Sequence, residues 1–156
     1  MKLRHVSVLS FACLALAACS SSNSPPASDA FEGTWTYSTG SAIATCAGNV
    51  TTTQPTGTVT IAAGTASGTI VFINAASPDC TFTFNVNGNE ATIEPNQTCT
   101  VTSSGETIAQ TITTFTLTLA NNVLTQSSAS TAVLNENGSS EDCTGTTTAT
   151  LTQVAK

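Results

Sequence analysis

The sequence predicts an all-β domain of about eight antiparallel strands over residues 31–156. Apolar and polar residues alternate with a period of two along most of this range, which is typical of strands with one buried face. Asn87-Gly88 and Asn121-Asn122 separate such segments and are frequent hairpin turn signals. Threonine, present 32 times, is β-branched and suits the solvent face of a strand.

Strands that follow one another through short turns form a meander, whose two edges must be hidden from neighbouring chains. Pairing of the first strand with the last would close the meander into an up-and-down barrel. A two-sheet β-sandwich fits the same periodicity, so it stays as the alternative. We expect strands at residues 31–38, 57–62, 68–73, 80–86, 91–101, 107–119, 123–134 and 144–154, and a polar loop at 135–142.

The long strand predicted at 107–119 changes its inward parity part-way. Ile112 is followed on the apolar face by Phe115, an odd step that a regular strand cannot make without turning the later side chains outward. One extra residue in the strand corrects the parity. The pattern therefore predicts a β-bulge near Thr113 and Thr114.

The N-terminal segment has the anatomy of an export signal. Lys2 and Arg4 form a basic start, and an uncharged apolar stretch follows at 6–16. This stretch is too short to cross a bilayer, which needs about 20 residues. An ordinary secretory signal cleaved after Ala18 would account for these features.

The end of this segment adds a more specific motif. Leu-Ala-Ala-Cys at 16–19 resembles the lipobox of bacterial lipoproteins. The resemblance implies that Cys19 receives a diacylglycerol, that residues 1–18 are removed, and that the new amino group is acylated. Two or three acyl chains anchor a protein stably, whereas one holds it only marginally.

Residues 20–30 follow as a polar segment with two adjacent prolines and no apolar periodicity. With Cys19 they make up residues 19–30, which we expect to be a lipid anchor and flexible tether to a single β-domain at 31–156. Ser20, rather than Asp, follows the cysteine. By resemblance to lipoprotein sorting, this implies delivery to the outer membrane of a bacterial envelope.

The charge of the chain limits its partners. Beyond residue 18 there is one basic residue, Lys156, against nine Asp and Glu. Nucleic-acid binding depends on Lys and Arg at phosphates, so nucleic acid is excluded as a partner. The same shortage of basic side chains weakens binding to anionic lipid headgroups, so we expect the Cys19 anchor to provide the membrane attachment. The sequence does not indicate a protein partner.

Four cysteines remain in the domain, an even number that favours disulfides in an exported chain. Cys80 and Cys99 flank a predicted hairpin turn at nearly equal distance, so the hairpin would bring them together. Cys46 follows the first strand and Cys143 precedes the last, so closure of the barrel would join them. The other two pairings stay open from spacing alone.

Enzymatic chemistry has few candidates. No histidine or arginine lies beyond residue 18, which excludes a Ser-His-Asp triad and an arginine clamp. Glu90 and Glu94 share one strand face, but positions i and i+4 on a strand lie about 13 Å apart, too far for a glycosidase pair. No cysteine spacing suits zinc. We expect a protein that is not an enzyme and has no metal or cofactor.

Gly33-Thr34-Trp35 in the first predicted strand resembles the Gly-x-Trp motif of lipocalins. The resemblance implies an eight-stranded barrel with an apolar cavity for a small hydrophobic molecule. This chain has no arginine beyond residue 18, so it lacks the arginine that packs over the tryptophan in lipocalins. The side chains expected to line such a cavity are Trp35, Phe82, Phe84, Phe115 and Leu117.

Two functions follow from this sequence. The first is an outer-membrane-anchored lipoprotein that binds a small apolar ligand in its barrel. The second is a structural or interaction protein of the cell envelope with a filled core. An open cavity of several hundred Å³ favours the first, and an interior packed with Phe and Leu favours the second.

Overall fold

The structure is a computed structural model that describes residues 27–103, 106–136 and 138–156. The predicted signal peptide at 1–18, Cys19 and the first part of the tether lie outside these residues. Within the described ranges, no helix is long and apolar enough to cross a membrane.

One short 3₁₀ helix precedes ten strands along the chain. The elements are η1 (Ala27–Ala30), β1 (Gly33–Cys46), β2 (Asn49–Thr53), β3 (Thr58–Ala63), β4 (Thr69–Asn74), β5 (Ser77–Asn87), β6 (Glu90–Ile93), β7 (Thr98–Ser103), β8 (Glu106–Ala120), β9 (Val123–Glu136) and β10 (Ser139–Ala155).

Eight of these strands form a closed antiparallel barrel. The order is β1-β3-β4-β5-β6-β8-β9-β10, and β10 pairs with β1 along most of its length. This pairing removes both edges of the meander and confirms the barrel predicted from the sequence. The closed ring rules out the two-sheet sandwich.

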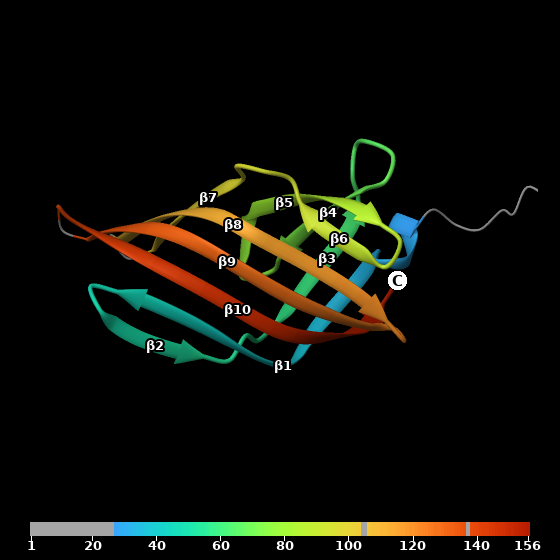
Figure 1. Cartoon of the computed structure of the whole chain (residues 1–156), viewed down its shortest axis with the longest axis horizontal. Coiled ribbons are helices and arrows are strands. Elements are labelled where there is room, and N and C mark those ends of the chain that lie inside the picture. The colour runs from blue at the N-terminus through green and yellow to red at the C-terminus, as the bar shows by residue number, and fades with distance from the viewer. Residues whose placement is uncertain (1–26, 104–105, 137) are drawn as a thin grey trace, which may run out of the picture.

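The long strands extend beyond the ring at one end, as Figure 1 shows. β1 pairs with β3 near its start and with β2 near its end. β8 pairs with β7 near its start and with β6 near its end. The result is a curved sheet, β2-β1-β10-β9-β8-β7, that projects from the barrel. We call this the extended end, and the opposite end, where η1 lies, the closed end.

The predicted strand at 91–101 is interrupted, because Pro95 has no backbone N–H and Asn96 has a left-handed φ of 61°. The side chain of Gln97 takes over the missing backbone pairing. Its amide accepts from the N–H of Thr83 and donates to the carbonyl of Thr83, both at 2.7 Å. The chain therefore forms β6 and β7 where one strand was expected.

β2 was not predicted from the sequence. The turn before it places Ala47 and Gly48 at positive φ, as a two-residue hairpin loop requires. At the β5–β6 hairpin the turn is confirmed, but the loop is Gly88-Asn89, and only Gly88 has positive φ. The prediction had placed the loop one residue earlier.

Residues 135–142 were expected to form a polar loop, and most of them are strand instead. β9 continues to Glu136 and β10 begins at Ser139, so a short hairpin joins them. The end of the predicted tether differs as well. Ala27–Ala30 form η1, in which Ser28 is buried.

The bulge and both cysteine pairings are confirmed. The β8–β9 register slips between Ile112 and Thr114, and the hydroxyl of Thr113 donates to the carbonyl of Ala129 at 2.8 Å. Cys80 and Cys99 form a disulfide between β5 and β7. The second disulfide, between β1 and β10, is described next.

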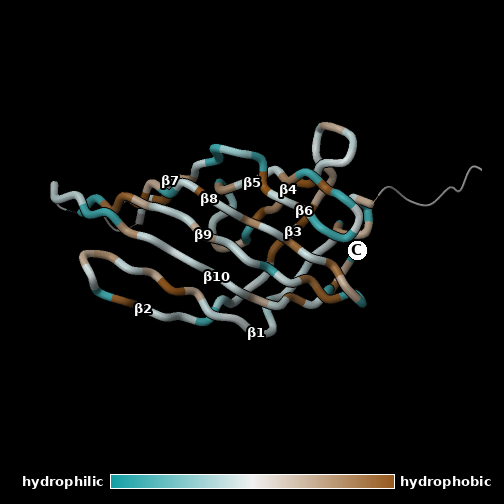
Figure 2. Tube along the Cα trace, viewed as in Figure 1, coloured by the Kyte–Doolittle hydropathy of each residue, from teal (hydrophilic) through white to brown (hydrophobic). Residues whose placement is uncertain are grey.

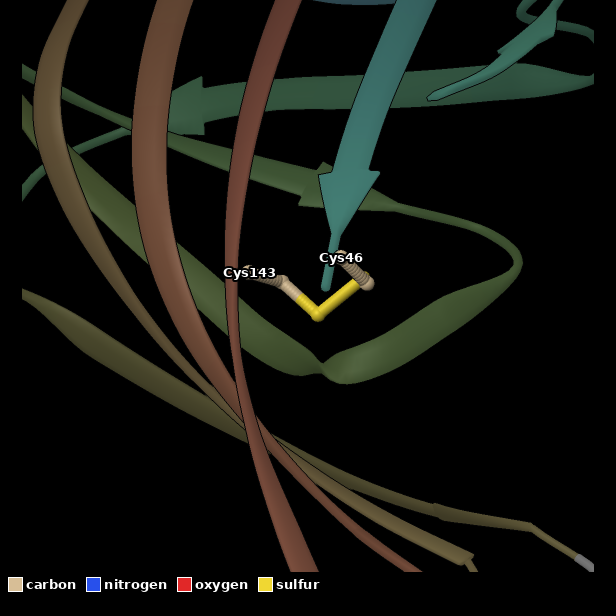
Figure 3. Close-up of a disulfide and its surroundings, with 2 residues drawn as sticks. All are labelled: Cys46 and Cys143. Carbon is tan, nitrogen blue, oxygen red and sulfur yellow. A yellow bond between two sulfur atoms is a disulfide. The ribbon is translucent and has the colours of Figure 1, made fainter. Parts of the chain in front are cut away.

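Cys46 and Cys143 are directly opposite each other on neighbouring strands, with Cα atoms 4.3 Å apart. Figure 3 shows this disulfide where β1 ends beside β10. The two Cα atoms are as close as opposed residues of an antiparallel pair come at a non-hydrogen-bonded position. The disulfide therefore fixes the seam that closes the sheet.

The core fills the closed end. Its completely buried large side chains are Trp35, Phe31, Phe84, Ile61, Ile70, Leu117, Leu124, Leu151 and Val59. Elsewhere the strands carry few apolar side chains. β9 and β10 are mostly pale in Figure 2, because Thr, Ser, Ala and Gly dominate them. Close packing is therefore concentrated at one end of the molecule.

Candidate ligand-binding cavity

A cavity of about 350 Å³ begins where the packed core stops and opens toward the extended end. Ligand pockets usually measure about 300–1,000 Å³, so this one suits a small molecule. Its lining comes from eight strands and consists of Tyr37, Ala42, Ile43, Ala44, Thr51, Thr53, Phe72, Asn74, Ser77, Cys80, Phe82, Val101, Gln110, Ile112, Phe115, Gln126, Ser128, Ser130, Gly145, Thr146 and Thr147.

Aromatic rings form the inner wall of the cavity. Phe115 on β8 lies with its ring centroid 5.2 Å from that of Phe72 and 6.3 Å from that of Phe82. It also packs edge-on against Phe84 at 4.9 Å, which belongs to the core. Edge-to-face contacts at these distances hold aromatic rings in fixed orientations. Phe115 thus joins the rigid core to the cavity wall.

A partly buried polar pair lies beside this wall. The hydroxyl of Tyr37 donates to Oε1 of Gln126 at 3.1 Å. Burial raises the pKa of Tyr37 to about 12, and the hydrogen bond to Gln126 opposes the rise. Gln126 is only 6% exposed. The phenol is therefore neutral at physiological pH.

A second polar pair lies nearer the extended end. The side-chain nitrogen of Gln110 donates to the hydroxyl oxygen of Ser130 at 2.7 Å, across the β8–β9 interface. Opposite Ser130 on β10 is Gly145, where an added Cβ would lie 3.0 Å from the Ser130 hydroxyl. The glycine therefore leaves room for the cavity at this level.

The structure divides the five predicted lining residues between the cavity and the core. Phe82 and Phe115 line the cavity. Trp35, Phe84 and Leu117 are 0% exposed and pack in the closed end. All five face inward, as expected, but the barrel is filled at the level of the last three.

Trp35 has a structural task at the closed end. Its indole N–H donates to the carbonyl of Phe31 at 2.8 Å, which ties the segment after η1 to the first strand. Gly33 of the same motif has a φ of 135°, and an added Cβ would lie 2.5 Å from the carbonyl oxygen of Ala155. The Gly-x-Trp motif thus packs the start of β1 against the segment that precedes it and against the end of β10, and it does not line the cavity.

Tyr37, Gln110 and Gln126 were not among the predicted site residues. A signal for them exists in the sequence. Gln126, Ser128 and Ser130 have the same parity as Leu124, so four inward positions in a row pass from apolar to polar. Polar residues at inward positions of a barrel strand indicate an unfilled interior.

The cavity offers hydrogen bonds and apolar contact, without acid–base groups. None of the described residues that line it is Asp, Glu, Lys, Arg or His. One cluster of potential metal ligands lies at the extended end, where atoms of Cys46, Cys143 and Glu141 come within 4.8 Å of one another. Both sulfurs belong to the disulfide, so the cluster retains one carboxylate as a ligand.

Comparison with known proteins finds no significant match, whether to a protein-family model, to a curated protein sequence or to a solved structure.

Proposed function

We propose that this chain is a lipid-anchored protein of the bacterial envelope whose barrel binds a small, mainly apolar ligand. The cavity of about 350 Å³ beneath the extended sheet carries the proposal. Phe82 and Phe115 give it an apolar wall, while hydrogen-bonding groups stand at fixed positions beside that wall. An apolar surface with a few placed polar groups is the usual composition of a small-molecule site.

The lipid anchor rests on the sequence. Leu-Ala-Ala-Cys at 16–19 supports acylation of Cys19, and the serine at position 20 supports sorting to the outer membrane. These residues lie outside the described structure. The two disulfides fit the same location, because disulfides form and persist in oxidising compartments such as the periplasm.

A structural or interaction role is the second candidate. β2 favours it, because all five of its residues are exposed and, among the described strands, it pairs with β1 alone, so its other edge is open. Val50 on this strand is 66% exposed. Exposed strand edges can pair with another chain. Under this hypothesis the cavity would be incidental.

Filling the cavity tests the leading proposal. The mature chain with Cys19→Ala, exported behind an ordinary secretory leader, needs no detergent, and its binding of the neutral dye Nile red can be titrated by fluorescence. Ser128 faces the cavity, so Ser128→Trp is expected to abolish binding. Its neighbour Ser127 is exposed on the opposite face of β9, so Ser127→Trp is the matched control and should bind normally.

Ala42→Phe fills the same cavity from β1 and serves as a second blocking variant if Ser128→Trp does not fold. Loss of binding in a folded blocking variant, with the control unaffected, supports the proposal. Binding of the dye that persists in both folded blocking variants would place it elsewhere and contradict the proposal.

A further inference from the structure

The amino group of Gln126 faces the cavity without a partner. Its Oε1 accepts from Tyr37, but its nitrogen makes no hydrogen bond to any described residue. In the described part of the chain, every buried side-chain nitrogen or oxygen that is closed to solvent has a partner. The unpaired amino group must therefore be open to the cavity, although the residue is 94% buried because its exposed fraction is 6%.

An unpaired N–H group in a largely buried position favours a ligand that carries a hydrogen-bond acceptor. Leaving such a donor unsatisfied in a site emptied of water is costly, so a ligand that displaces water must replace its hydrogen bond. Carbonyl, ester, ether and hydroxyl oxygens meet this need. Ser128, the next inward residue on β9, also lines the cavity and has no hydrogen-bond partner among the described residues. Its hydroxyl can assist.

The same surroundings disfavour ions. No described lining residue carries a charge, and the Tyr37 phenol is neutral. The full chain has a net charge of −6, which opposes anions. A buried carboxylate would have no cation beside it, and a buried ammonium would meet the N–H groups of Gln126 instead of a carboxylate. Burying either ion without a partner is unfavourable.

Outward from Gln126 the lining is mixed as far as Gln110 and Ser130, whose side chains are hydrogen-bonded to each other, and it becomes mainly apolar beyond them. A second hollow of about 280 Å³ shares Ala44, Gln110, Ser130 and Gly145 with the cavity and continues along the extended sheet to Leu134. Ile108 lines this hollow and is 41% exposed, an unusual amount for an inward-facing isoleucine. Together the two hollows form a trough that leads outward from the Tyr37–Gln126 pair.

We infer that the ligand is an uncharged, elongated amphiphile that binds with its polar end inward. Its oxygen accepts a hydrogen bond from the amino group of Gln126, and its apolar chain lies against Phe115 and Ile112 and continues toward Ile108. The inference rests on the proposed function and adds to it the head-group chemistry and the direction of binding.

Ligands that share one alkyl chain and differ in their heads test this directly. Displacement of Nile red is measured with decan-1-ol, methyl decanoate, decane, decanoate and decyltrimethylammonium at neutral pH, below their micellar concentrations. The protein is the detergent-free mature chain with Cys19→Ala. All ten strands and both disulfides lie within residues 33–155, so this chain keeps the whole core.

The alcohol and the ester are expected to bind at least about tenfold more tightly than either ion, because the ions lose their hydration without gaining a partner. Gln126→Leu removes the donor and keeps the apolar volume. It should weaken the affinity for the alcohol by about three- to tenfold and leave the affinity for decane unchanged. Gln153→Leu is the control, since Gln153 lies at the closed end and donates to the carbonyl of Glu32.

The outcomes separate the two proposals. Equal affinity for all five heads in the wild-type protein would overturn the inference while leaving ligand binding intact. The same holds if Gln126→Leu, shown to be folded by circular dichroism, weakens decane as much as the alcohol. No displacement by any of the five would overturn the inference, whereas the proposed function would still be decided by whether the folded blocking variants lose Nile red.

Discussion

The Tyr37 hydroxyl donates a 3.1 Å hydrogen bond to Oε1 of Gln126, a residue 89 positions later in the sequence. The bond spans from β1 to β9 at the level where the packed core gives way to the cavity. It fixes the orientation of the Gln126 amide, so that the nitrogen faces the cavity. One phenol thereby orients the donor on which the inferred ligand chemistry depends.

Ionisation of Tyr37 predicts a loss of stability in alkali. Its pKa is raised from 10.0 to about 12 in the folded protein. Below about pH 10 the group is neutral in both states and its stabilising effect is complete. Between about pH 10 and 12 the unfolded chain loses the proton first, so the free energy of unfolding should fall by about 2–3 kcal/mol.

Urea unfolding at about pH 9 and about pH 11 checks this prediction, because about half of the decrease, roughly 1.4 kcal/mol, should be present at pH 11. Tyr37→Phe is the comparison, because it has no phenol to ionise and should show a smaller decrease. The chain has a single tyrosine, so tyrosinate absorbance reports the same pKa directly. An identical decrease in both proteins would show that Tyr37 is not the group responsible.

The two disulfides should differ in their effect on stability. Cys46 and Cys143 are 97 positions apart, whereas Cys80 and Cys99 are 19 apart. In the chain-entropy model, removing the longer crosslink costs about 4–5 kcal/mol and removing the shorter one about 3 kcal/mol. Paired Cys→Ala variants compared by urea unfolding test the order. A loss below about 1 kcal/mol for the Cys46–Cys143 pair would contradict the stabilising role of the closing seam.

Gly33→Ala should destabilise the barrel by about 2–3 kcal/mol. The added Cβ would meet the carbonyl oxygen of Ala155 in a backbone conformation, φ 135°, that alanine rarely adopts. Gly48 is the matched control, because it also has positive φ but has no atom within 4 Å of an added Cβ. Gly48→Ala should cost about 1 kcal/mol. Equal losses in thermal or urea unfolding would argue against a steric role for Gly33.

Cys19→Ala should release the chain from the membrane when it is exported behind an ordinary secretory leader. With one basic residue beyond position 18, the domain has little else to bind an anionic surface. Fractionation of cells that express the wild-type and variant chains measures this. Cys13→Ala, made in the chain with its own residues 1–18, is the control and should stay in the membrane fraction. Retention of the Cys19→Ala chain in the membrane fraction would refute a single lipid attachment.

Several features of the fold could be predicted because they depend on parity and chain order. The odd step from Ile112 to Phe115 locates the bulge, and the positions of Cys46 and Cys143 relative to the first and last strands predict their pairing. Both arguments need only the two-residue period of a strand and the closure of the sheet. The structure contains both features.

Other features depend on contacts that one strand does not specify. The break at Pro95 leads to two strands because the side chain of Gln97 can replace a backbone amide opposite Thr83. β2 forms because β1 continues beyond its pairing with β3, and the later part of β1 has an edge with which β2 can pair. The sequence alone could not place the cavity, since Phe84 and Phe115 are both inward-facing aromatic residues and differ only in their level along the barrel axis.

The position of the chain ends has a consequence for exchange of the ligand. The described chain begins with η1, and η1 and the C-terminal end both lie at the closed end, away from the cavity (Figure 1). Under the proposed acylation of Cys19, the protein would be attached through its sealed side. The mouth of the trough would then lie at the end of the barrel away from the attachment point, and the lipids beneath the sealed side would have no direct route into it. In this orientation the barrel would collect its cargo from solution or from a donor protein, without extracting it from the leaflet that anchors it.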